Sequence, residues 1–578
     1  MENTQTQQTQ YPGVITGGIV GLLLTLPLLA LFFLGNTLVR LPLVPLDFFD
    51  FLVPIIPGDL ITFVIDIMVD AIIGLGFGDS VDTIAKRIEQ AMGYGFILAV
   101  GVVVGAVFFA TARNFENFLY GAGAVVGAVI GVVFTAISLN NAFFSTDPRF
   151  AALWVMGLFV AWGVAFGWLY RDISLLPVKA KKAAPAAAAT AGEPAMEIPE
   201  AHVERMGRRE FLVRVGGATA TLTVVGAGLG LLIGEPGEPA PSVAADIEQQ
   251  TENGLGNALP NANAEVQPAP GMRPEYTPVE QHYRIDIASR PIEIDLATWT
   301  LPFTGLIAED RAFTMAELRE MDSLDQYITL QCISNRIAGN LISTTKWTGV
   351  PVRDVLAQLD IDEDGKWLRI DGGDGFFEYV SIDMIMEDER IVFAYDWDGQ
   401  PIPERNGFPL RIYIPERYGM KQPKWITAIE VVAEDERGYW VRRGWSATAI
   451  MQTTSIVDTI ANQDLFEDED GNIRVPVGGY AMSSTRGISK VEVSVDGGEW
   501  TEAQIRTPIS DKTWVFWRYD WLFESGTHEF AVRCYEGDGT PQPEEEQDVR
   551  PDGATGIHSA SARLANNLMD GTEEPAGA

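Results

Sequence analysis

Ile328 to Leu359, ITLQCISNRIAGNLISTTKWTGVPVRDVLAQL, is the stretch from which we interpret the rest of the chain. The run Tyr327–Leu330 predicts a strand that delivers Cys332 into the polar turn Ser334–Arg336, and an amphipathic helix follows Pro351. A thiolate at a strand end, beside an arginine and backbone amides, suits metal ligation or nucleophilic chemistry, and we expect its pKa to be lowered there. The alternative is a small apolar residue that closes a buried strand, because buried cysteines are common.

Three blocks of sequence around this stretch carry a resemblance. Cys332-x-x-Asn-Arg, followed by Lys-Trp-Thr-Gly-Val-Pro at 346–351, resembles the molybdopterin domain of the sulfite oxidase family. The block NGFPLR at 406–411, with YGMKQPKW at 418–425, is similar to that family's pocket wall, and HYRID at 282–286 adds a third match. The resemblance covers about half of the chain, from about Pro274 to Arg563.

The resemblance implies a molybdenum–molybdopterin cofactor whose metal is bound by the Cys332 thiolate, since soft sulfur ligands suit such a redox metal. The residues that it places at the cofactor are Tyr283, Arg284, Cys332, Asn335, Asp371, Asn406, Arg411, Lys421 and Lys424. Of these, Arg411, Lys421 and Lys424 would bind the pterin phosphate. Arg284 and Arg336 would act beside Cys332 as catalytic cations on the substrate. For each charged residue the alternative is a surface ion pair.

The chain also departs from the family pattern. Arg336 is followed by Ile337 where sulfite oxidases commonly have a second arginine, and Asn406 and Lys421 stand where they have histidine and arginine. These residues look more like the bacterial sulfoxide-reductase branch. Two reactions on a small oxyanion or oxide therefore stay open: oxidation of sulfite and reduction of an S- or N-oxide.

Composition limits the other functions. The net charge of −37 and the sequence pI of about 4.4 argue against nucleic-acid binding, which needs a basic surface. Such an acid excess is typical of a halophilic source, and an acidic extracellular protein is the alternative. Two cysteines, Cys332 and Cys534, exclude a disulfide framework but allow one bridge. Cys534 lies in a strand pattern and is expected in the core.

The N-terminal part predicts membrane helices. Val14–Leu34 is an apolar run of the length that spans a bilayer. Three further runs are rich in Gly and Ala, which let helices pack closely in lipid: Ala91–Ala112, Leu119–Leu139 and Ala151–Tyr170. Phe51–Phe77 is apolar but contains Asp59, Asp66 and Asp70, so a spanning helix with an acidic face and an interfacial helix both stay open. The chain is predicted to cross the membrane five or six times.

Positive charge gathers between Arg171 and Arg209, which predicts a cytoplasmic loop. The segment Gly207–Leu212, GRREFL, with the apolar span up to Ile233, resembles an internal twin-arginine export signal. The alternative is two arginines that flank an ordinary helix. Both interpretations place everything after Gly234 outside the cytoplasm, so the chain is expected to be a multi-pass protein of the cell membrane.

The expected fold class is an α-helical membrane bundle, then an α+β molybdopterin domain of the sulfite oxidase type, then an immunoglobulin-like β-sandwich. The phrase VEVSVDGGEW, Val491–Trp500, resembles the family's dimerisation domain and implies a homodimer. The predicted boundaries are 1–175 membrane helices, 176–204 Ala/Pro linker, 205–234 twin-arginine-like helix, 235–272 tether, 273–445 molybdopterin domain, 446–565 sandwich and 566–578 tail.

No second redox centre is predicted. The histidines, His202, His282, His528 and His558, all lie outside the clear membrane runs, and neither a haem motif nor an iron–sulfur cysteine cluster is present in the sequence. Electrons would then come from or go to an external carrier, a quinone or a redox subunit. Two other classes stay open: a cofactor-free, membrane-anchored binding module, and a transport or assembly subunit supported by the three aspartates of 51–77.

Overall fold

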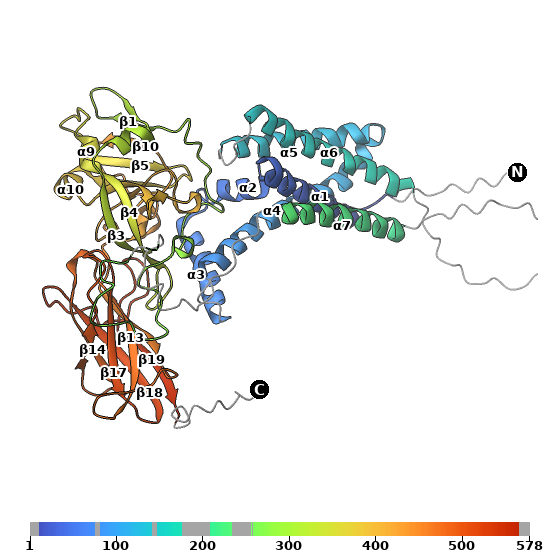
Figure 1. Cartoon of the computed structure of the whole chain (residues 1–578). Helices are drawn as coiled ribbons and strands as arrows, with labels where there is room; N and C mark the ends of the chain where they lie inside the picture. Colours follow the sequence, from blue (N-terminus) through green and yellow to red (C-terminus); the bar gives the residue numbers. More distant parts are fainter. Residues whose placement is uncertain are drawn as a thin grey trace, which may run out of the picture. The chain divides into compact units, whose positions relative to one another are not determined.

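The computed structural model describes residues 11–75, 81–140, 147–175, 208–233, 256 and 258–565. These residues form two compact units, residues 1–55 with 87–238, and residues 56–86 with 239–578. The helices α1 to α7 span Val14–Val39, Val44–Leu52, Gly58–Gly74, Val81–Thr111, Leu119–Asn140, Pro148–Leu175 and Arg208–Ile233 (Figure 1). The predicted linker 176–204, the tail 566–578 and His202 lie outside the described residues.

The first unit is helical, as predicted, and glycines set the spacing of its helices. A Cβ atom on Gly127 of α5 would collide with the carbonyl oxygen of Phe159 in α6, and one on Gly163 would collide with that of Gly123. Small residues thus allow the two backbones to touch. Among the described helices, four are long and apolar enough to cross a membrane: Val14–Val39, Ile84–Phe115, Leu119–Asn140 and Pro148–Ser174.

The acidic apolar segment 51–77 forms only the short helix α3, of 17 residues, which is not among those four. A loop at 53–57 separates it from α2. The side chains of Asp59, Asp66 and Asp70 lie outside the described residues.

The second unit is rich in strands. Strands β1 to β10 span Leu301–Gly305, Arg311–Phe313, Leu324–Gln331, Ile342–Pro351, Trp367–Gly372, Phe377–Ser381, Val392–Trp397, Gln400–Pro401, Arg411–Tyr413 and Ile426–Val432. Helices α8, α9 and α10 span Met315–Glu320, Val352–Leu356 and Ile382–Glu387. The predicted strand before Cys332 is β3, and the helix predicted after Pro351 is α9.

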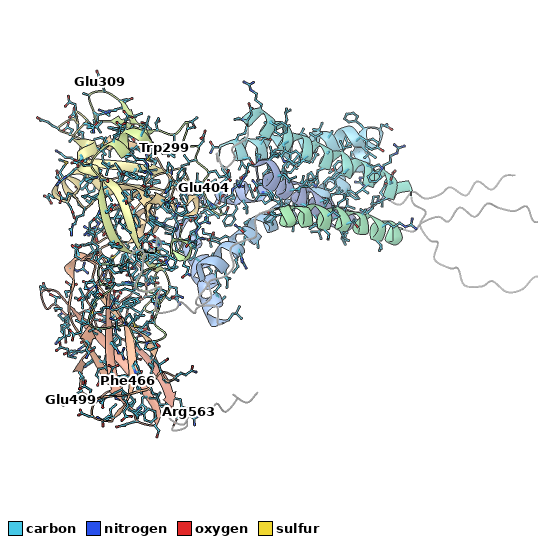
Figure 2. The ribbon with its side chains drawn as sticks, in the orientation of Figure 1. Trp299, Glu309, Glu404, Phe466, Glu499 and Arg563 are labelled. Carbon is cyan, nitrogen blue, oxygen red and sulfur yellow. The ribbon has the colours of Figure 1, made fainter. Side chains whose placement is uncertain are left out.

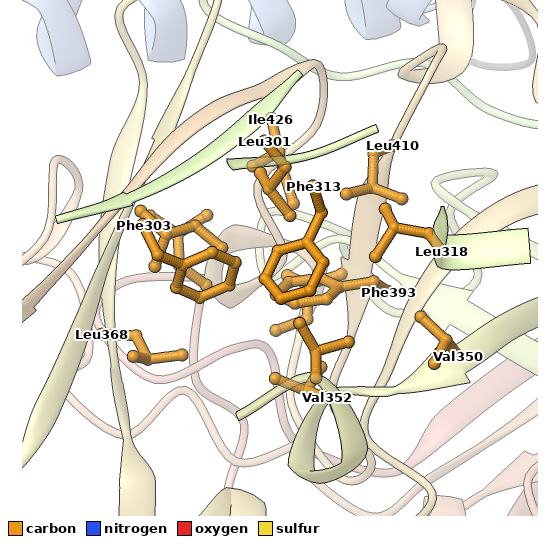
Figure 3. Close-up of a cluster of buried hydrophobic side chains, with 14 of the residues drawn as sticks. Leu301, Phe303, Phe313, Leu318, Val350, Val352, Leu368, Phe393, Leu410 and Ile426 are labelled. Atoms are coloured by element: carbon orange, nitrogen blue, oxygen red, sulfur yellow. The ribbon is translucent and has the colours of Figure 1, made fainter. Parts of the chain in front are cut away.

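Two sheets enclose the core of this region. One has the order β2-β1-β10-β5-β6, and the other has the order β3-β4-β7-β8 with β9 also paired to β7. Phe303 of β1, Leu368 of β5 and Phe393 of β7 meet between them, with Val352 of α9 closing one side (Figure 3). Leu301 and Phe303 of β1, and Leu368 and Ile370 of β5, are alternate residues that face this core, as the period of two in a strand requires.

Residues 446–565 form a second strand-rich region. Strands β11 to β19 span Thr454–Ile460, Phe466–Glu467, Ile473–Met482, Ile488–Val495, Thr501–Glu502, Gln504–Ile505, Val515–Leu522, Gly526–Glu536 and His558–Leu564. They form one sheet with the order β11-β13-β17-β16 and another with the order β15-β14-β18-β19. Val477, Trp517 and Val532 from both sheets share one core, so the region is a two-sheet sandwich. Its immunoglobulin-like topology stays a prediction.

Both cysteines are free and buried, and Cys534 lies in the sandwich core as expected. Charged side chains such as Glu309 and Glu499 lie on the exposed loops, in keeping with the acidic composition (Figure 2).

The predicted tether 235–272 differs from the structure where residues are described. Leu259, Asn261 and Met272 are buried, and Asn261 donates a hydrogen bond to the buried carboxylate of Glu275 at 2.8 Å. Arg506 pairs with the same carboxylate at 2.8 Å. Residues 258–272 are therefore packed, because this polar network holds them against the sandwich.

We expect Phe393→Ala to lower the free energy of unfolding by about 3–5 kcal/mol, since it empties a ring-sized volume in a fully buried core. The midpoint of urea unfolding of the detergent-solubilised chain, followed by tryptophan fluorescence, measures the loss. Leu296→Ala, at a side chain that is 42% exposed, is the control and should shift the midpoint little. Equal shifts for the two variants would contradict the assigned core.

Candidate functional site

Cys332 follows the last residue of β3 and lies in a tight turn, as predicted. It is 7% exposed, and its backbone N–H donates to the carbonyl oxygen of Leu341 at 3.0 Å. Its Sγ lies 3.0 Å from the hydroxyl of Ser334. Asn335 closes the turn, because its Oδ1 accepts the N–H of Leu341 at 2.9 Å and its own N–H donates to the Cys332 carbonyl at 3.0 Å.

The predicted lowering of the thiol pKa was wrong. Burial raises the pKa of Cys332, and the hydrogen bond with Ser334 and the charge of Lys424 offset only part of that effect. The prediction assumed a turn open to solvent and a dominant arginine. The buried position disfavours a free thiolate, so a thiolate here needs a metal ion or another strong electrophile as its partner.

Tyr283 lies close to this thiol. Its ring is buried, its backbone N–H donates to the Ser343 hydroxyl at 3.1 Å, and burial and then the proximity of Cys332 raise the pKa of its phenol. Gly419 lies against the phenol: a Cβ atom there would be 3.2 Å from the Tyr283 hydroxyl. The glycine therefore leaves room for an O–H group that points into the site.

Arg411 is a buried cation without a carboxylate partner in the described part of the chain. Its guanidinium carbon lies 4.6 Å from the ring centre of Trp347 and 5.3 Å from that of Trp397. It donates to the carbonyl oxygen of Asn406 at 2.8 Å, while its Nε has no hydrogen-bond partner among the described residues. Burial lowers the pKa of Arg411 to about 10. A buried, unpaired guanidinium is costly, so this position favours an anion.

His282 shares these tryptophans. Its ring stacks on Trp397, with centres 4.4 Å apart, and its Nδ1–H donates to the carbonyl oxygen of Tyr283 at 3.1 Å. Burial and the charge of Arg411 lower the pKa of His282 to about 3, so the ring is neutral. Its buried Nε2 has no partner within the described residues and can accept a hydrogen bond. The sequence block HYRID contained this residue, but nothing in the pattern assigned it a role.

Asp286 organises the other cations. Its carboxylate is 1% exposed and pairs with Arg284 at 2.7 Å and with Lys424 at 3.1 Å. Burial alone would raise the pKa of Asp286, but the charges of Lys424, Lys86 and Arg284 hold it well below its usual range. The carboxylate therefore stays ionised and fixes the two predicted cofactor residues. Sequence reasoning quoted Asp286 in a block and missed this function.

Lys424 lies near enough to the thiol for its charge to act on Cys332, and its predicted contact with the pterin phosphate stays a prediction. Its ammonium donates to the carbonyl oxygen of Ile285 at 3.0 Å and lies 4.4 Å from the ring centre of Trp425. The Trp425 indole in turn donates to the carbonyl oxygen of Glu404 at 2.6 Å. Burial lowers the pKa of Lys424 to about 8 against the opposing effect of Asp286. Part of its side chain, 13%, remains exposed, so its charge can reach a ligand.

Lys421 forms a buried ion pair, and its predicted contact with the pterin phosphate stays a prediction. Its ammonium lies 2.9 Å from a carboxylate oxygen of Glu378 in β6, and the Glu378 side chain is fully buried. Lys421 is therefore committed to a buried ion pair that fixes the loop 418–425 on the sheet. Nothing in the local sequence indicated this partner, which is 43 residues away in the chain.

Asp371 is the penultimate residue of β5 and pairs with Arg369 at 2.9 Å. No described contact joins it to Cys332 or Lys424, and its predicted place at the cofactor stays a prediction. Asp374, in the next turn, is the acid that approaches the site: burial and the charge of Asp286 raise its pKa to about 7. Arg336 follows Asn335 in the cysteine turn, and its predicted contact with substrate stays a prediction.

Comparisons with known proteins agree with this geometry. Residues 288–440 match the model of the oxidoreductase molybdopterin binding domain, and residues 446–549 match that of the Mo-co oxidoreductase dimerisation domain. The chain is 26% identical over 353 residues to sulfite oxidase of Arabidopsis thaliana, covering 51% of this chain and 88% of that protein. The chain thus contains a molybdopterin binding domain and a Mo-co dimerisation domain, and it is similar to sulfite oxidases.

Two other relatives match over smaller shares of this chain and of their own length than the Arabidopsis protein does. Nitrate reductase [NADH] 2 of Phaseolus vulgaris is 28% identical over 330 residues, which is 46% of this chain and 37% of that protein. The putative protein-methionine-sulfoxide reductase subunit YedZ1 of Azospira oryzae is 32% identical over 157 residues, which is 27% of this chain and 56% of that protein. The chain therefore spans only part of these two proteins.

The residues fit the molybdenum–pterin cofactor of this oxidoreductase family. A soft sulfur ligand, Cys332, lies at the strand end, and two cations, Arg411 and Lys424, lie in its surroundings without being fully compensated. The free acceptor of His282 and the free donor of Arg411 are buried polar atoms that need partners. An anionic group on a ring with N–H donors would satisfy both atoms: the anion would accept a hydrogen bond from Arg411, and a ring N–H would donate one to Nε2 of His282.

We expect Lys424→Met to lower the cofactor content of the protein and Lys421→Met to lower its stability. Lys424→Met removes a charge that faces the site, so the molybdenum and pterin content of purified protein should fall about tenfold, as for loss of one charge-assisted hydrogen bond. Lys421→Met leaves the Glu378 carboxylate buried and unpaired, so stability should fall by about 3–5 kcal/mol. Urea unfolding measures the second effect. The assignment fails if Lys421→Met loses cofactor at unchanged stability.

We expect His282 to make the folded chain sensitive to acid. Its pKa is about 3 in the folded protein and about 6.5 when unfolded, so the unfolded state binds the extra proton between these values. Its stabilising contribution is complete above about pH 6.5 and declines by about 1.4 kcal/mol per unit as pH falls toward 3. Urea unfolding at several pH values should show a shallower decline for His282→Phe than for wild type. Parallel curves would contradict a buried neutral ring.

Proposed function

We propose that the chain is a membrane-anchored, extracytoplasmic molybdenum-cofactor oxidoreductase that transfers an oxygen atom. The observation that carries this proposal is the buried thiol of Cys332 together with two buried cations: Arg411, whose Nε has no hydrogen-bond partner among the described residues, and Lys424, which shares the Asp286 carboxylate with other cations. Cys332 would bind molybdenum, and Arg411, Lys424 and Asn406 would hold the pterin and its phosphate. The bound molybdenum centre supplies oxygen-atom transfer coupled to two-electron redox chemistry.

For the substrate, we propose a neutral S- or N-oxide. Arg284, one of the two arginines expected to bind an anion, is already neutralised by the buried carboxylate of Asp286. Lys424 shares that carboxylate, so the site offers little unpaired charge for a dianion. The oxide would accept two electrons and two protons and leave as the reduced compound and water, with the Tyr283 hydroxyl donating to its oxygen. A relative named as a methionine-sulfoxide reductase subunit supports this direction.

Sulfite oxidation is the second candidate. The match to Arabidopsis sulfite oxidase covers 88% of that protein, which supports it. Arg336, in the cysteine turn, would then be the cation nearest to the bound anion. The two candidates differ in the sign of electron flow, so one assay separates them.

The membrane setting supports an external electron partner. The chain's apolar helices anchor it, and the arginine-rich segment 171–209 with its twin-arginine-like sequence supports export of the domain after Gly234. Electrons would pass to or from a soluble carrier, a quinone or a redox subunit. The dimerisation-domain match at 446–549 supports a homodimer. We retain the predicted boundaries 273–445 and 446–565, and the matched ranges lie within them.

We expect about one molybdenum per chain in protein purified from a host that makes the cofactor, as one thiolate ligand implies. With a reduced viologen dye, this protein should reduce a dialkyl sulfoxide or an amine N-oxide, and Cys332→Ser should lower the rate by at least about a hundredfold because it removes the metal's sulfur ligand. Elemental analysis and dye oxidation measure the two results.

Cys534→Ser is the matched control, since Cys534 is buried in the sandwich away from the site, and its activity should be retained. Sulfite-dependent reduction of ferricyanide without oxide reduction would overturn the substrate assignment but keep the enzyme class. A well-folded protein without molybdenum would favour the cofactor-free binding module.

A further inference from the structure

Lys86 belongs to the first part of α4, far from the site in sequence, yet it contacts a site residue. Its ammonium donates to the carbonyl oxygens of Asp286 at 2.8 Å and of Ala288 at 3.0 Å, and it lies 3.5 Å from the Asp286 carboxylate. The Lys86 side chain is 14% exposed. Both residues belong to the second unit, which includes residues 56–86.

The segment 285–288 is thus held by two lysines. Lys424 donates to the carbonyl oxygen of Ile285, and Lys86 donates to those of Asp286 and Ala288. Both ammonium groups also pair with the one buried carboxylate of Asp286, as does Arg284. A buried carboxylate with three cations has a fixed geometry, because each cation limits where the others can lie. Loss of Lys86 would free the side of Asp286 opposite to Lys424.

We propose that Lys86 is a positioning residue of the cofactor site, supplied by the helix that enters the membrane. The proposal rests on the proposed function, because the site that Lys86 supports is the one assigned to the cofactor. It acts through Asp286 on Lys424 and Arg284 and does not touch the substrate.

The same contact determines the path of the chain across the membrane. Lys86 lies at the beginning of a helix long enough to cross, Ile84–Phe115, so this end must lie on the same side as Asp286. The chain then passes through α4, α5 and α6 before it reaches α7. These three crossings alone would leave Asp286 on the side of the membrane opposite to Lys86, which it contacts. Helix α7, Arg208–Ile233, must therefore be a fourth crossing.

Other observations agree with this path. Helix α7 packs along α1, one of the four long apolar helices, in the first unit; its own apolar stretch among the described residues, Val213–Val225, is shorter than theirs, so its crossing is inferred from the path and not from its length. The positive segment between α6 and α7 then lies on the side opposite to the catalytic domain, as the positive-inside bias requires for an extracytoplasmic domain. The N-terminus lies on that same cytoplasmic side, because α1 crosses once before residues 40–86.

The first test measures cofactor retention in the full chain in detergent, as molybdenum and pterin fluorescence that remain after gel filtration. Lys86→Met should retain about tenfold less than wild type, the effect of losing one charge-assisted hydrogen bond, and Lys86→Arg should restore most of it. Arg87→Met, which removes the same charge at the exposed neighbouring residue, is the control and should match wild type. In Asp286→Asn, the additional change Lys86→Met should have little further effect.

The outcomes separate the two proposals. A wild-type chain without cofactor would overturn the proposed function and this role of Lys86 together. A loaded wild type in which Lys86→Met retains as much cofactor as Arg87→Met would overturn the role of Lys86 alone. Failure of Lys86→Arg to restore retention would overturn it as well, since arginine keeps the charge.

The second test does not need the cofactor. Both native cysteines are buried, so single cysteines can be introduced and labelled with a membrane-impermeant maleimide in sealed vesicles. Leu75→Cys, before α4, and Asp310→Cys, in the catalytic domain, should react from the same side, and Asn114→Cys, after α4, from the opposite side. Labelling of Leu75→Cys and Asn114→Cys from one side would overturn the assigned path.

Discussion

A single carboxylate with almost no exposed surface, that of Asp286, holds the cations of the site in place. Burial of a charge is tolerated only when it is paired and hydrogen-bonded, and here Arg284 and Lys424 provide that pairing at 2.7 and 3.1 Å. The segment that carries Asp286 precedes the first strand, whereas Lys424 precedes β10. The ion pairs therefore join two parts of the chain that no β-ladder connects.

The sheets supply the rigid side of the same site. Trp347 of β4 and Trp397 of β7 lie next to each other, and Arg411 of β9 and His282 lie on these rings. Cys332 enters from the end of β3, the strand paired with β4. Strands thus position the proposed metal ligand, Cys332, and the arginine proposed to bind an anion, Arg411, while loops supply other polar groups. This division is usual where catalytic residues must be held on a stable framework.

The sequence predicted the parts of this site whose signals are local. The strand before Cys332, the asparagine that closes its turn, and the membrane helices follow from alternation, turn chemistry and apolar runs. The ion pair of Lys421 with Glu378 joins residues 43 positions apart and has no local signal. The raised pKa of Cys332 depends on burial depth, which a pattern does not contain. Asp371 lies in β5 and Asp374 lies three residues later in the turn that follows, and only the backbone path decides which one approaches the site.

The charge distribution favours an uncharged substrate. A net charge of −37 repels anions at long range, although salt at about 0.15 M limits this effect to about 8 Å. Close to Cys332, the Asp286 carboxylate already neutralises part of the positive charge. The anionic cofactor expected on Arg411 and Lys424 would neutralise more of it. The net negative charge of the chain would therefore repel a sulfite dianion at long range. Only the positive charge that remains unpaired near Cys332 could bind it. An S- or N-oxide carries no net charge and needs only one good donor at its oxygen, which the Tyr283 hydroxyl can provide beside the space left by Gly419.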